Sequence, residues 1–263
     1  MAERTNNRGA SAFDAFYSRM HGERWEALRG CLSRPGNPVA YTDGLIAPYY
    51  LDEASIAAAR ALEVQPGDSV LDMCAAPGGK SLVLAVAATA AGTLVANERS
   101  AARRARLIRV LDDHLPPQLR ARVTVTSHDA TRWGLYEKNR YDRVLLDAPC
   151  SSESHVIRSP EHLAQWSAAR TQHLATQAHA MLAAAVEAAK PGGLILYSTC
   201  SVSGIENDEV LRRLLKKRGQ LVTIVPTANG SGERTEFGTE IFPDRCNGQG
   251  PIYFALLRKS GRD

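Results

Sequence analysis

The sequence predicts an α/β protein whose centre is a doubly wound, seven-stranded and mostly parallel sheet. From Asp68 onward, short apolar runs alternate with helical patterns, and glycine or proline separates many of them. Short continuous apolar runs are typical of strands that are buried on both faces. Strands that alternate with helices form parallel sheets covered on both sides, because each connection crosses over the sheet.

Seven runs are predicted to be strands. In chain order they are 69–73, 93–96, 122–126, 143–146, 194–198, 221–225 and 252–257. The helical patterns between and around them cover 79–90, 100–113, 161–190 and 205–218. Residues 151–160, which lie between the fourth strand and the longest helix, are expected to form a loop.

A small helical extension is predicted over residues 1–65, ahead of the sheet domain at 66–263. Apolar positions between Ser11 and Leu32 recur with a helical period that is interrupted at Gly22. Residues 33–50 are rich in proline and glycine and are expected to form a loop. A short amphipathic helix should follow from Asp52 to Leu62.

The composition narrows the class of protein. A formal net charge of +4 permits a polyanionic partner without requiring one. The five cysteines are odd in number and form no C-x-x-C pair, so neither a disulfide framework nor a metal site is expected. No signal peptide and no membrane-spanning run is recognised, so we expect a reduced internal compartment and no membrane partner.

The turn after the first strand consists of small residues and leads into a helix. It reads CAAPGGK over residues 74–80. Small side chains let a ligand approach the backbone, and a helix N-terminus favours an anionic group. The turn is neither G-x-G-x-x-G nor a P-loop, because Cys74 stands where a P-loop needs glycine, so phosphoryl transfer is disfavoured.

Carboxylates follow the next two strands. Glu98 lies about twenty residues beyond Gly79, where doubly wound folds bind a ribose. Asp129 follows the third strand and suits an adenine amine. With the glycine turn, these acids predict a nucleoside cofactor without a pyrophosphate, such as S-adenosylmethionine; the alternative is that both are ordinary solvated loop acids.

Two strands end in cysteine. The fourth runs into Asp147, Pro149 and Cys150, and the fifth ends at Cys200. Pro149 ends the strand because it has no N–H, and Asp147 lies at the carboxyl end, where open sheets bind ligands. Each cysteine alone would be read as a small buried apolar residue. Together they predict that both thiols act on one flat heterocycle.

These segments together resemble the Sun (Fmu) family of RNA cytosine-C5 methyltransferases, and the N-terminal helices resemble the branch that contains the mitochondrial ribosomal-RNA enzyme. The similar segments are DMCAAPGGK at 72–80, DAPCSS at 147–152, YSTCS at 197–201 and GQGPIYFALLRK at 248–259. The resemblance covers about residues 40–259. It implies a Rossmann-like S-adenosylmethionine-dependent methyltransferase, with 66–263 as its catalytic domain.

The resemblance also implies roles for individual residues. Cys200 would be the nucleophile, Cys150 would release the product, and Asp147 would lie between cofactor and base. The expected cofactor-binding residues are Cys74, Ala75, Ala76, Pro77, Gly78, Gly79, Lys80, Glu98, Asp129 and Asp147. Glu98 departs from the family pattern, in which an aspartate is commoner at that position.

The implied chemistry is addition of a thiolate to the ring carbon beside carbon 5 of cytosine, which makes the base enamine-like. A free cysteine is only a few per cent ionised at neutral pH, so positive charge from the cofactor or Lys80 is expected to assist. Ribosomal RNA is the favoured substrate and transfer RNA the second; a non-catalytic RNA-binding scaffold is the alternative. A protein specificity partner or a ribosomal particle is expected, in the cytoplasm or, for a trimmed organellar form, in the mitochondrial matrix.

Overall fold

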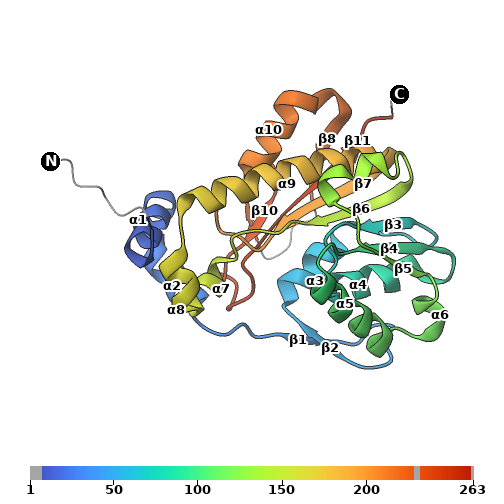
Figure 1. The fold of residues 1–263 in the computed structure, drawn as a ribbon, viewed down its shortest axis with the longest axis horizontal. Coiled ribbons are helices and arrows are strands. Elements are labelled where there is room, and N and C mark those ends of the chain that lie inside the picture. Colours follow the sequence, from blue (N-terminus) through green and yellow to red (C-terminus); the bar gives the residue numbers. More distant parts are fainter. Residues whose placement is uncertain (1–7, 228–231, 262–263) are drawn as a thin grey trace.

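One large mixed sheet with helices on both faces organises the protein (Figure 1). The computed structural model describes residues 8–227 and 232–261. Within these residues the strand order is β5-β4-β3-β6-β7-β11-β10-β9, and β8 also pairs with β11. Strands β3 to β7 are mutually parallel, and β11 is antiparallel to β7, β8 and β10.

All seven predicted strands are present. They are β3 Ser69–Asp72, β4 Thr93–Asn97, β5 Val123–Thr126, β6 Tyr141–Asp147, β7 Ala189–Thr199, β8 Val222–Val225 and β11 Ile252–Lys259. Two short strands were not predicted, β9 Glu233–Arg234 and β10 Thr239–Ile241. They are too short to show a period, and they extend the sheet from seven strands to nine in the described part of the chain.

Helices on the two faces of the sheet cover separate apolar cores. On one face lie α3 Glu53–Arg60, α4 Gly79–Ala88, α5 Ala101–His114 and α6 Pro117–Arg120, and on the other η3 Ala130–Leu135, α9 Ala168–Ala188 and α10 Asp208–Arg218. Leu145 of β6 faces the first core, whereas its neighbours Val144 and Leu146 face the second. Strands buried on both faces explain the continuous apolar runs of the sequence.

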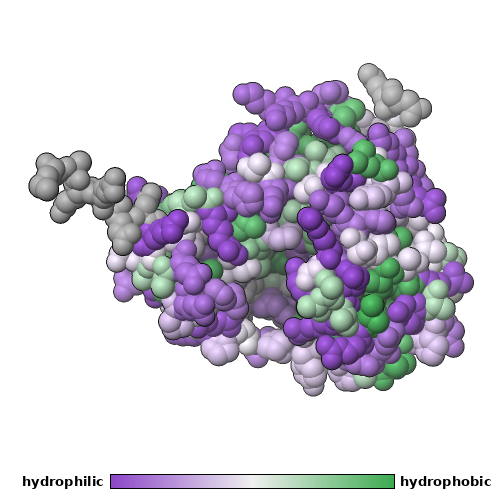
Figure 2. All heavy atoms as spheres, in the orientation of Figure 1, coloured by the Kyte–Doolittle hydropathy of each residue, from purple (hydrophilic) through white to green (hydrophobic). Residues whose placement is uncertain are grey.

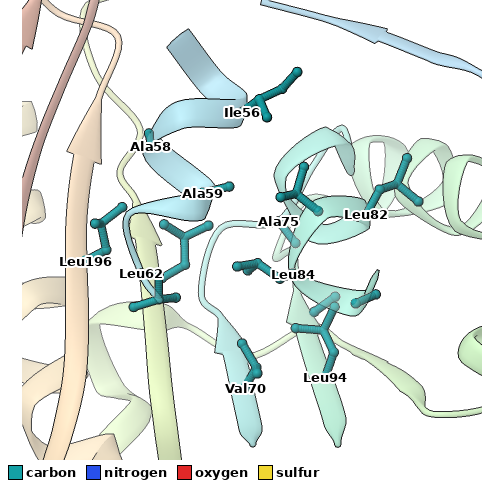
Figure 3. Close-up of a cluster of buried hydrophobic side chains, with 14 of the residues drawn as sticks. Ile56, Ala58, Ala59, Leu62, Val70, Ala75, Leu82, Leu84, Leu94 and Leu196 are labelled. Carbon is teal, nitrogen blue, oxygen red and sulfur yellow. The ribbon is translucent and has the colours of Figure 1, made fainter. Parts of the chain in front are cut away.

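The first core contains Leu62, which follows α3, together with Leu84 of α4 and Leu196 of β7 (Figure 3). A third core joins the N-terminal helices α1 Ala10–His21 and α2 Trp25–Leu32 to the region after β6. The predicted break between them is present as the one-turn helix η1 Gly22–Arg24, and Gly22 has a φ of 59°. The expected division at residue 65 stays a prediction, since α3 packs into the sheet's own core.

The predicted loops at 151–160 and 33–50 are partly wrong, because both contain short helices or strands. Residues 151–160 contain α7 Glu153–Arg158 and the start of α8 Pro160–Gln165. The predicted long helix 161–190 is interrupted at Trp166, and the predicted helix 205–218 begins only at Asp208. Within 33–50, the strands β1 Val39–Tyr41 and β2 Tyr49–Leu51 pair as a small separate sheet. Elements this short gain their stability from tertiary packing, so they leave no periodic pattern.

The space-filling view shows a hollow between the N-terminal helices and the part of the molecule that contains α5 (Figure 2). The visible rim of this hollow is mostly hydrophilic. No helix in the described residues is long and apolar enough to cross a membrane.

Candidate active site

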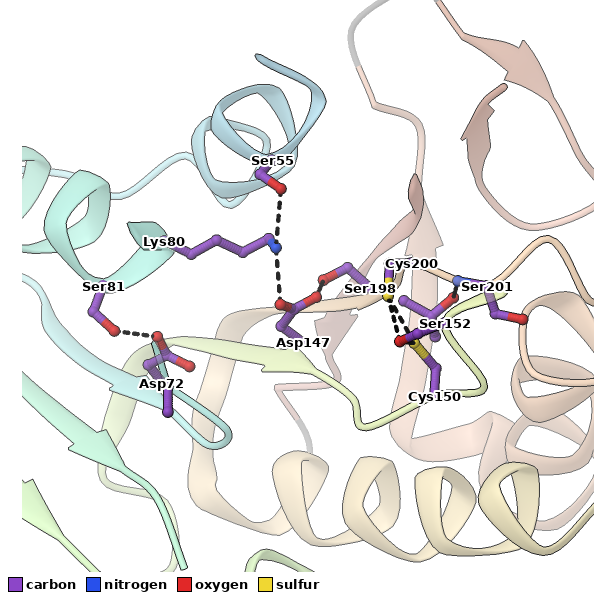
Figure 4. Close-up of polar contacts among 12 residues, drawn as sticks. Ser55, Asp72, Lys80, Ser81, Asp147, Cys150, Ser152, Ser198, Cys200 and Ser201 are labelled. Carbon is purple, nitrogen blue, oxygen red and sulfur yellow. Dashed lines mark hydrogen bonds and ion pairs between the residues drawn. The ribbon is translucent and has the colours of Figure 1, made fainter. Parts of the chain in front are cut away.

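The two cysteines that end β6 and β7 lie side by side (Figure 4). These strands are parallel neighbours, with Asp147 opposite Ser198, so their carboxyl ends meet at one edge of the sheet. The Sγ atoms of Cys150 and Cys200 are 3.1 Å apart. Cys200 is exposed and Cys150 is half-buried. The predicted convergence of the two thiols is therefore confirmed.

The surroundings favour ionisation of one thiol over the other. The hydrogen bond from Cys150 lowers the pKa of Cys200, and the Ser152 hydroxyl 3.1 Å away lowers it further; partial desolvation by the surrounding protein atoms opposes both. The same hydrogen bond, with burial, raises the pKa of Cys150. Cys200 thus ionises first, and Cys150 remains a proton donor beside it. Ser152 was not among the predicted site residues.

Asp147 is held by two donors. The ammonium of Lys80 donates to its Oδ2 at 2.8 Å, and the hydroxyl of Ser198 donates to its Oδ1 at 2.7 Å (Figure 4). Burial disfavours the charge on Lys80, but the Asp147 carboxylate outweighs burial and raises the pKa of Lys80. Lys80 also reaches Ser55 of α3 at 3.3 Å. The sequence predicted Lys80 as part of the cofactor turn and as a source of positive charge near the thiols, and the structure pairs it with Asp147.

The expected cofactor residues line two adjoining pockets. Glu98 and Asp129 line the first, together with Cys74, His128 and Pro149 among others. The second is lined by Cys74, Ala75, Ala76, Pro77, Gly79, Lys80 and Asp147, with Tyr49, Leu51, Ser55 and Asp72. Cys74 borders both, so the acids and the turn face one continuous region.

Gly78 is the one expected cofactor residue that neither of these pockets includes. Its φ is 122°, a conformation that side chains rarely adopt. A Cβ there would lie 2.9 Å from the side chain of Val110 on α5. The glycine is therefore needed for the shape of the turn and for close packing of α5.

Arginines neutralise the acids of the first pocket. Glu98 accepts from the backbone of Ser100 and lies 3.4 Å from the guanidinium of Arg103. Hydrogen bonds from Thr131 lower the pKa of Asp129, burial opposes them, and Arg99 pairs with the carboxylate at 3.3 Å. Two carboxylates that face one pocket fit a nucleoside, whose ribose hydroxyls and base amine can donate to them.

Three buried acids near the site were missed from the sequence. Asp72 is 1% exposed, accepts from Ser81 at 2.6 Å and has a second carboxyl oxygen without a partner. Burial raises the pKa of Asp72 to about 7. Glu153 and Glu206 lie beneath the cysteines. Asp72 could have been found as the acid that ends the first strand, but no sequence signal distinguishes the other two.

The parallel strand order, the glycine turn and the acids at the strand ends define the Rossmann-like class of methyltransferases. Within that class, the chain belongs to the 16S rRNA methyltransferase RsmB/F family, whose model matches residues 59–258. This match confirms the family resemblance that the motifs indicated.

Individual relatives agree with this assignment. The 5-cytosine rRNA methyltransferase NSUN4 of Bos taurus is 44% identical over 173 residues, which are 64% of this chain and 45% of that protein. The mitochondrial tRNA (cytosine(34)-C(5))-methyltransferase of Danio rerio is 41% identical over 169 residues, 64% of this chain and 46% of that protein. The chain thus spans less than half the length of these two relatives.

A solved structure, a methyltransferase homolog protein from Pyrococcus horikoshii, superposes with a TM-score of 0.75. It shares 21% sequence identity, and the superposition covers 94% of each chain. At this identity the likeness shows the fold alone, which agrees with the predicted doubly wound α/β class.

Proposed function

We propose that the protein methylates carbon 5 of a cytosine in RNA, with S-adenosylmethionine as methyl donor and a covalent bond between Cys200 and the base. The observation that carries this proposal is the pair of thiols 3.1 Å apart, beside the Asp147–Lys80 ion pair. Two thiols at adjoining strand ends suit a reaction that needs one sulfur to attack and a second group to assist its departure.

The two pockets supply a set of residues for the cofactor. Glu98 is suited to accept hydrogen bonds from ribose hydroxyls and Asp129 to accept from the adenine amine. The turn from Cys74 to Lys80 would surround the methionine part. When bound, S-adenosylmethionine supplies a methyl group on a positively charged sulfur. Arg99 and Arg103 have exposed side chains, which can move away from the two acids when a cofactor binds.

The protein's own groups then act on the base. The Cys200 thiolate adds to ring carbon 6, and electron density moves to carbon 5. Lys80 and Ser198 orient Asp147 so that its carboxylate can accept from the cytosine amine. After methyl transfer, Cys150 stands beside the carbon–sulfur bond. A water molecule, or Cys150 in its thiolate form, accepts the proton of carbon 5, the double bond between carbons 5 and 6 forms again, and Cys200 leaves as a thiolate. The base must first leave its stack, at a cost of a few kcal/mol.

Ribosomal RNA is the favoured substrate, because both the family and the bovine relative are named for it. Transfer RNA is the second candidate, and the Danio rerio relative supports it. A protein partner or a ribosomal particle would help to select the target RNA. The proposed compartment is the cytoplasm or the mitochondrial matrix, and the relative named as mitochondrial favours the second.

Trapping the covalent adduct tests the proposal. With RNA and S-adenosylmethionine, Cys200→Ala should abolish both adduct and methyl transfer, whereas Cys150→Ala should accumulate a protein–RNA adduct. Cys246→Ala, a half-buried cysteine elsewhere, is the matched control and should behave as wild type. The reverse outcome for the two cysteines would exchange their roles.

A non-catalytic scaffold would bind cofactor and RNA without methyl transfer or adduct. Bisulfite mapping of ribosomal and transfer RNA from cells that lack the protein would identify the substrate and the position.

A further inference from the structure

Two glutamates lie fully buried beneath the cysteine pair. Glu153 is the first residue of α7 and is 0% exposed, and Glu206 lies between β7 and α10 and is 1% exposed. Glu206 accepts from the backbone N–H of Ser151 at 2.9 Å and also contacts its hydroxyl. Glu153 accepts from the backbone N–H of Val202 at 3.1 Å. Each carboxyl group therefore holds the chain next to one of the two thiols.

A single hydroxyl connects the two carboxyl groups. The Oγ of Ser201 lies 2.9 Å from Glu153 Oε1 and 3.1 Å from Glu206 Oε1. Ser201 follows Cys200 directly, as Ser151 follows Cys150. Tyr17 of α1 donates to the same Glu153 oxygen at 2.5 Å. The segments that carry the two thiols are thus joined through one buried network, to which the N-terminal helix also belongs.

This network contains two buried carboxyl groups and no cationic partner for them among the described residues. Neither glutamate has an ion pair with lysine or arginine in residues 8–227 and 232–261. Ionising two buried carboxylates that share one hydroxyl carries a large cost, so the pair holds a proton to a higher pH than an exposed glutamate would. Burial, and then Glu153, raise the pKa of Glu206 to about 7.

A proton on Glu206 completes the chain of hydrogen bonds. Glu206 then donates to Ser201, and Ser201 donates to Glu153. The other titratable or charged groups that face the pair are Tyr17, His21, Arg24, Cys150, Tyr197, Cys200 and Glu240. Burial lowers the pKa of His21, so this imidazole does not supply a compensating positive charge at neutral pH.

We propose that Glu206 and Glu153 are positioning residues for the two thiols, and that the single proton they share holds Cys150 and Cys200 at hydrogen-bonding distance. The inference rests on the proposed function, because these thiols are the groups that the function uses. Loss of the shared proton places a negative charge on each side of the Ser201 hydroxyl and separates Ser151 from Ser201, whose hydroxyls are 3.4 Å apart. Cys200 then loses the hydrogen bond that favours its thiolate.

The direction of the pH effect follows from the raised pKa of Glu206. Stabilisation by the protonated carboxyl is complete below its ordinary value of about 4.5 and is lost as the pH rises through about 7. Ionisation of Cys200 increases over the same range. The thiol pair is therefore expected to lose its favourable geometry at the alkaline pH at which an isolated cysteine would become most reactive.

The rate of alkylation of Cys200 by iodoacetamide, followed by peptide mass spectrometry, tests this inference without RNA or cofactor. Glu206→Gln keeps the hydrogen-bonding shape and carries no charge. It should match the wild type within about twofold at pH 6 and alkylate about threefold faster at pH 8.5. Asp142→Asn removes a carboxyl near the opposite end of β6, where it pairs with Lys190, and should follow the wild type at both values.

A reagent that needs both sulfurs at once separates geometry from charge. Phenylarsine oxide should bind wild type and Glu206→Gln equally at pH 6, and the variant about tenfold more tightly at pH 8.5. If Glu206→Gln does not fold, Glu153→Gln removes the same repulsion and should give the same result. Equal binding by variant and wild type at both pH values, or slow alkylation of the variant at pH 6, would overturn the proposal. Failure of methyl transfer would leave these readouts unchanged.

Discussion

The two ends of the site hold their acids and thiols by different means. At the thiol end, formed by Cys150, Cys200 and the glutamates beneath them, Glu153 and Glu206 are fully buried and accept hydrogen bonds from backbone N–H groups at 3.1 and 2.9 Å. At the acid end, formed by Glu98 and Asp129, the arginine partners Arg99 and Arg103 have side chains that are 75% and 52% exposed.

This difference separates two tasks. The ion pair of Asp129 with the exposed Arg99 is of a kind that contributes about 0–1 kcal/mol, so this acid can exchange its arginine for a ligand at little cost. The carboxylate of Glu98 is buried, and it keeps the backbone N–H of Ser100 as a donor if a ligand displaces the exposed Arg103. Removing one partner of a buried polar network leaves the other unsatisfied, at a cost of about 1–3 kcal/mol, so the thiol end keeps its geometry. A reaction that forms and breaks a carbon–sulfur bond needs fixed sulfurs, whereas a cofactor that enters and leaves needs replaceable contacts.

The largest effect is expected where the two ends meet. Asp147→Asn leaves the Lys80 ammonium, 14% exposed, without a counter-charge. The variant should lose about 3 kcal/mol of unfolding free energy and methyl transfer should slow at least roughly 100-fold. Urea unfolding and single-turnover methylation measure the two quantities.

Asp142→Asn is the control for this prediction, since Asp142 begins the same strand and pairs with Lys190 at 2.8 Å in a half-exposed setting. It should cost about 1 kcal/mol and leave methyl transfer unchanged. If the Asp147→Asn variant is as stable and as active as this control, neither stability nor methyl transfer depends on the ion pair between Lys80 and Asp147.

Asp72 is an exception to the difference between the two ends, because it is a buried acid that lies near the cofactor turn. Burial raises its pKa to about 7, so the folded protein keeps a proton that the unfolded chain releases near pH 4. This stabilisation is complete below about pH 4 and is lost as the pH rises through about 7. Asp72→Asn should match the wild type at pH 4 and be more stable by roughly 3 kcal/mol at pH 8.

Urea unfolding across this pH range measures the difference for Asp72. Ser81→Ala provides a comparison, because it removes the hydroxyl that donates to Asp72 without removing the titrating group. A constant stability difference between Asp72→Asn and wild type from pH 4 to pH 8 would contradict the raised pKa.

Asp129→Asn examines the acid end. Hydrogen bonds from Thr131 lower the pKa of this carboxyl, which is therefore charged at neutral pH. The variant should bind S-adenosylmethionine about tenfold more weakly, a change of about 1.4 kcal/mol, while its unfolding midpoint stays the same. Isothermal titration and thermal unfolding check both values. Asp112→Asn, at an exposed acid with an arginine partner, should change neither the affinity for S-adenosylmethionine nor the unfolding midpoint. A large loss of stability in Asp129→Asn would contradict the comparison, because the acid end would then depend on its polar contacts for folding as the thiol end does.

The sequence was sufficient for features that depend on local order along the chain. The seven strands, the glycine turn and the cysteines at two strand ends follow from apolar runs and from proline, and neighbouring parallel strands then bring their ends together. Glu98 and Asp129 were predicted for the same reason, since each follows a strand, and both side chains line the first pocket.

Features that depend on contacts between distant segments could not be predicted. Glu206 lies in the segment IENDEV, which reads as the polar start of a helix. Its burial results from contact with Ser151, 55 positions away. Helix α7 has six residues and shows no period, so Glu153 was assigned to a loop. Lys80 was placed in the cofactor turn, because the sequence does not reveal that its side chain reaches Asp147.

The smallest effect is expected from a single hydroxyl at the thiol end. Ser152→Ala removes one of the two hydrogen bonds that lower the pKa of Cys200 and leaves the one from Cys150. The thiolate fraction at pH 7 should fall about threefold, equivalent to about 0.7 kcal/mol, and the rate of alkylation of Cys200 reports it. Ser154→Ala changes a serine two positions further along, within helix α7, and should leave the rate of alkylation of Cys200 unchanged. An unchanged rate in Ser152→Ala as well would mean that Cys150 alone sets the reactivity of Cys200, and that the buried network controls the site through that one contact.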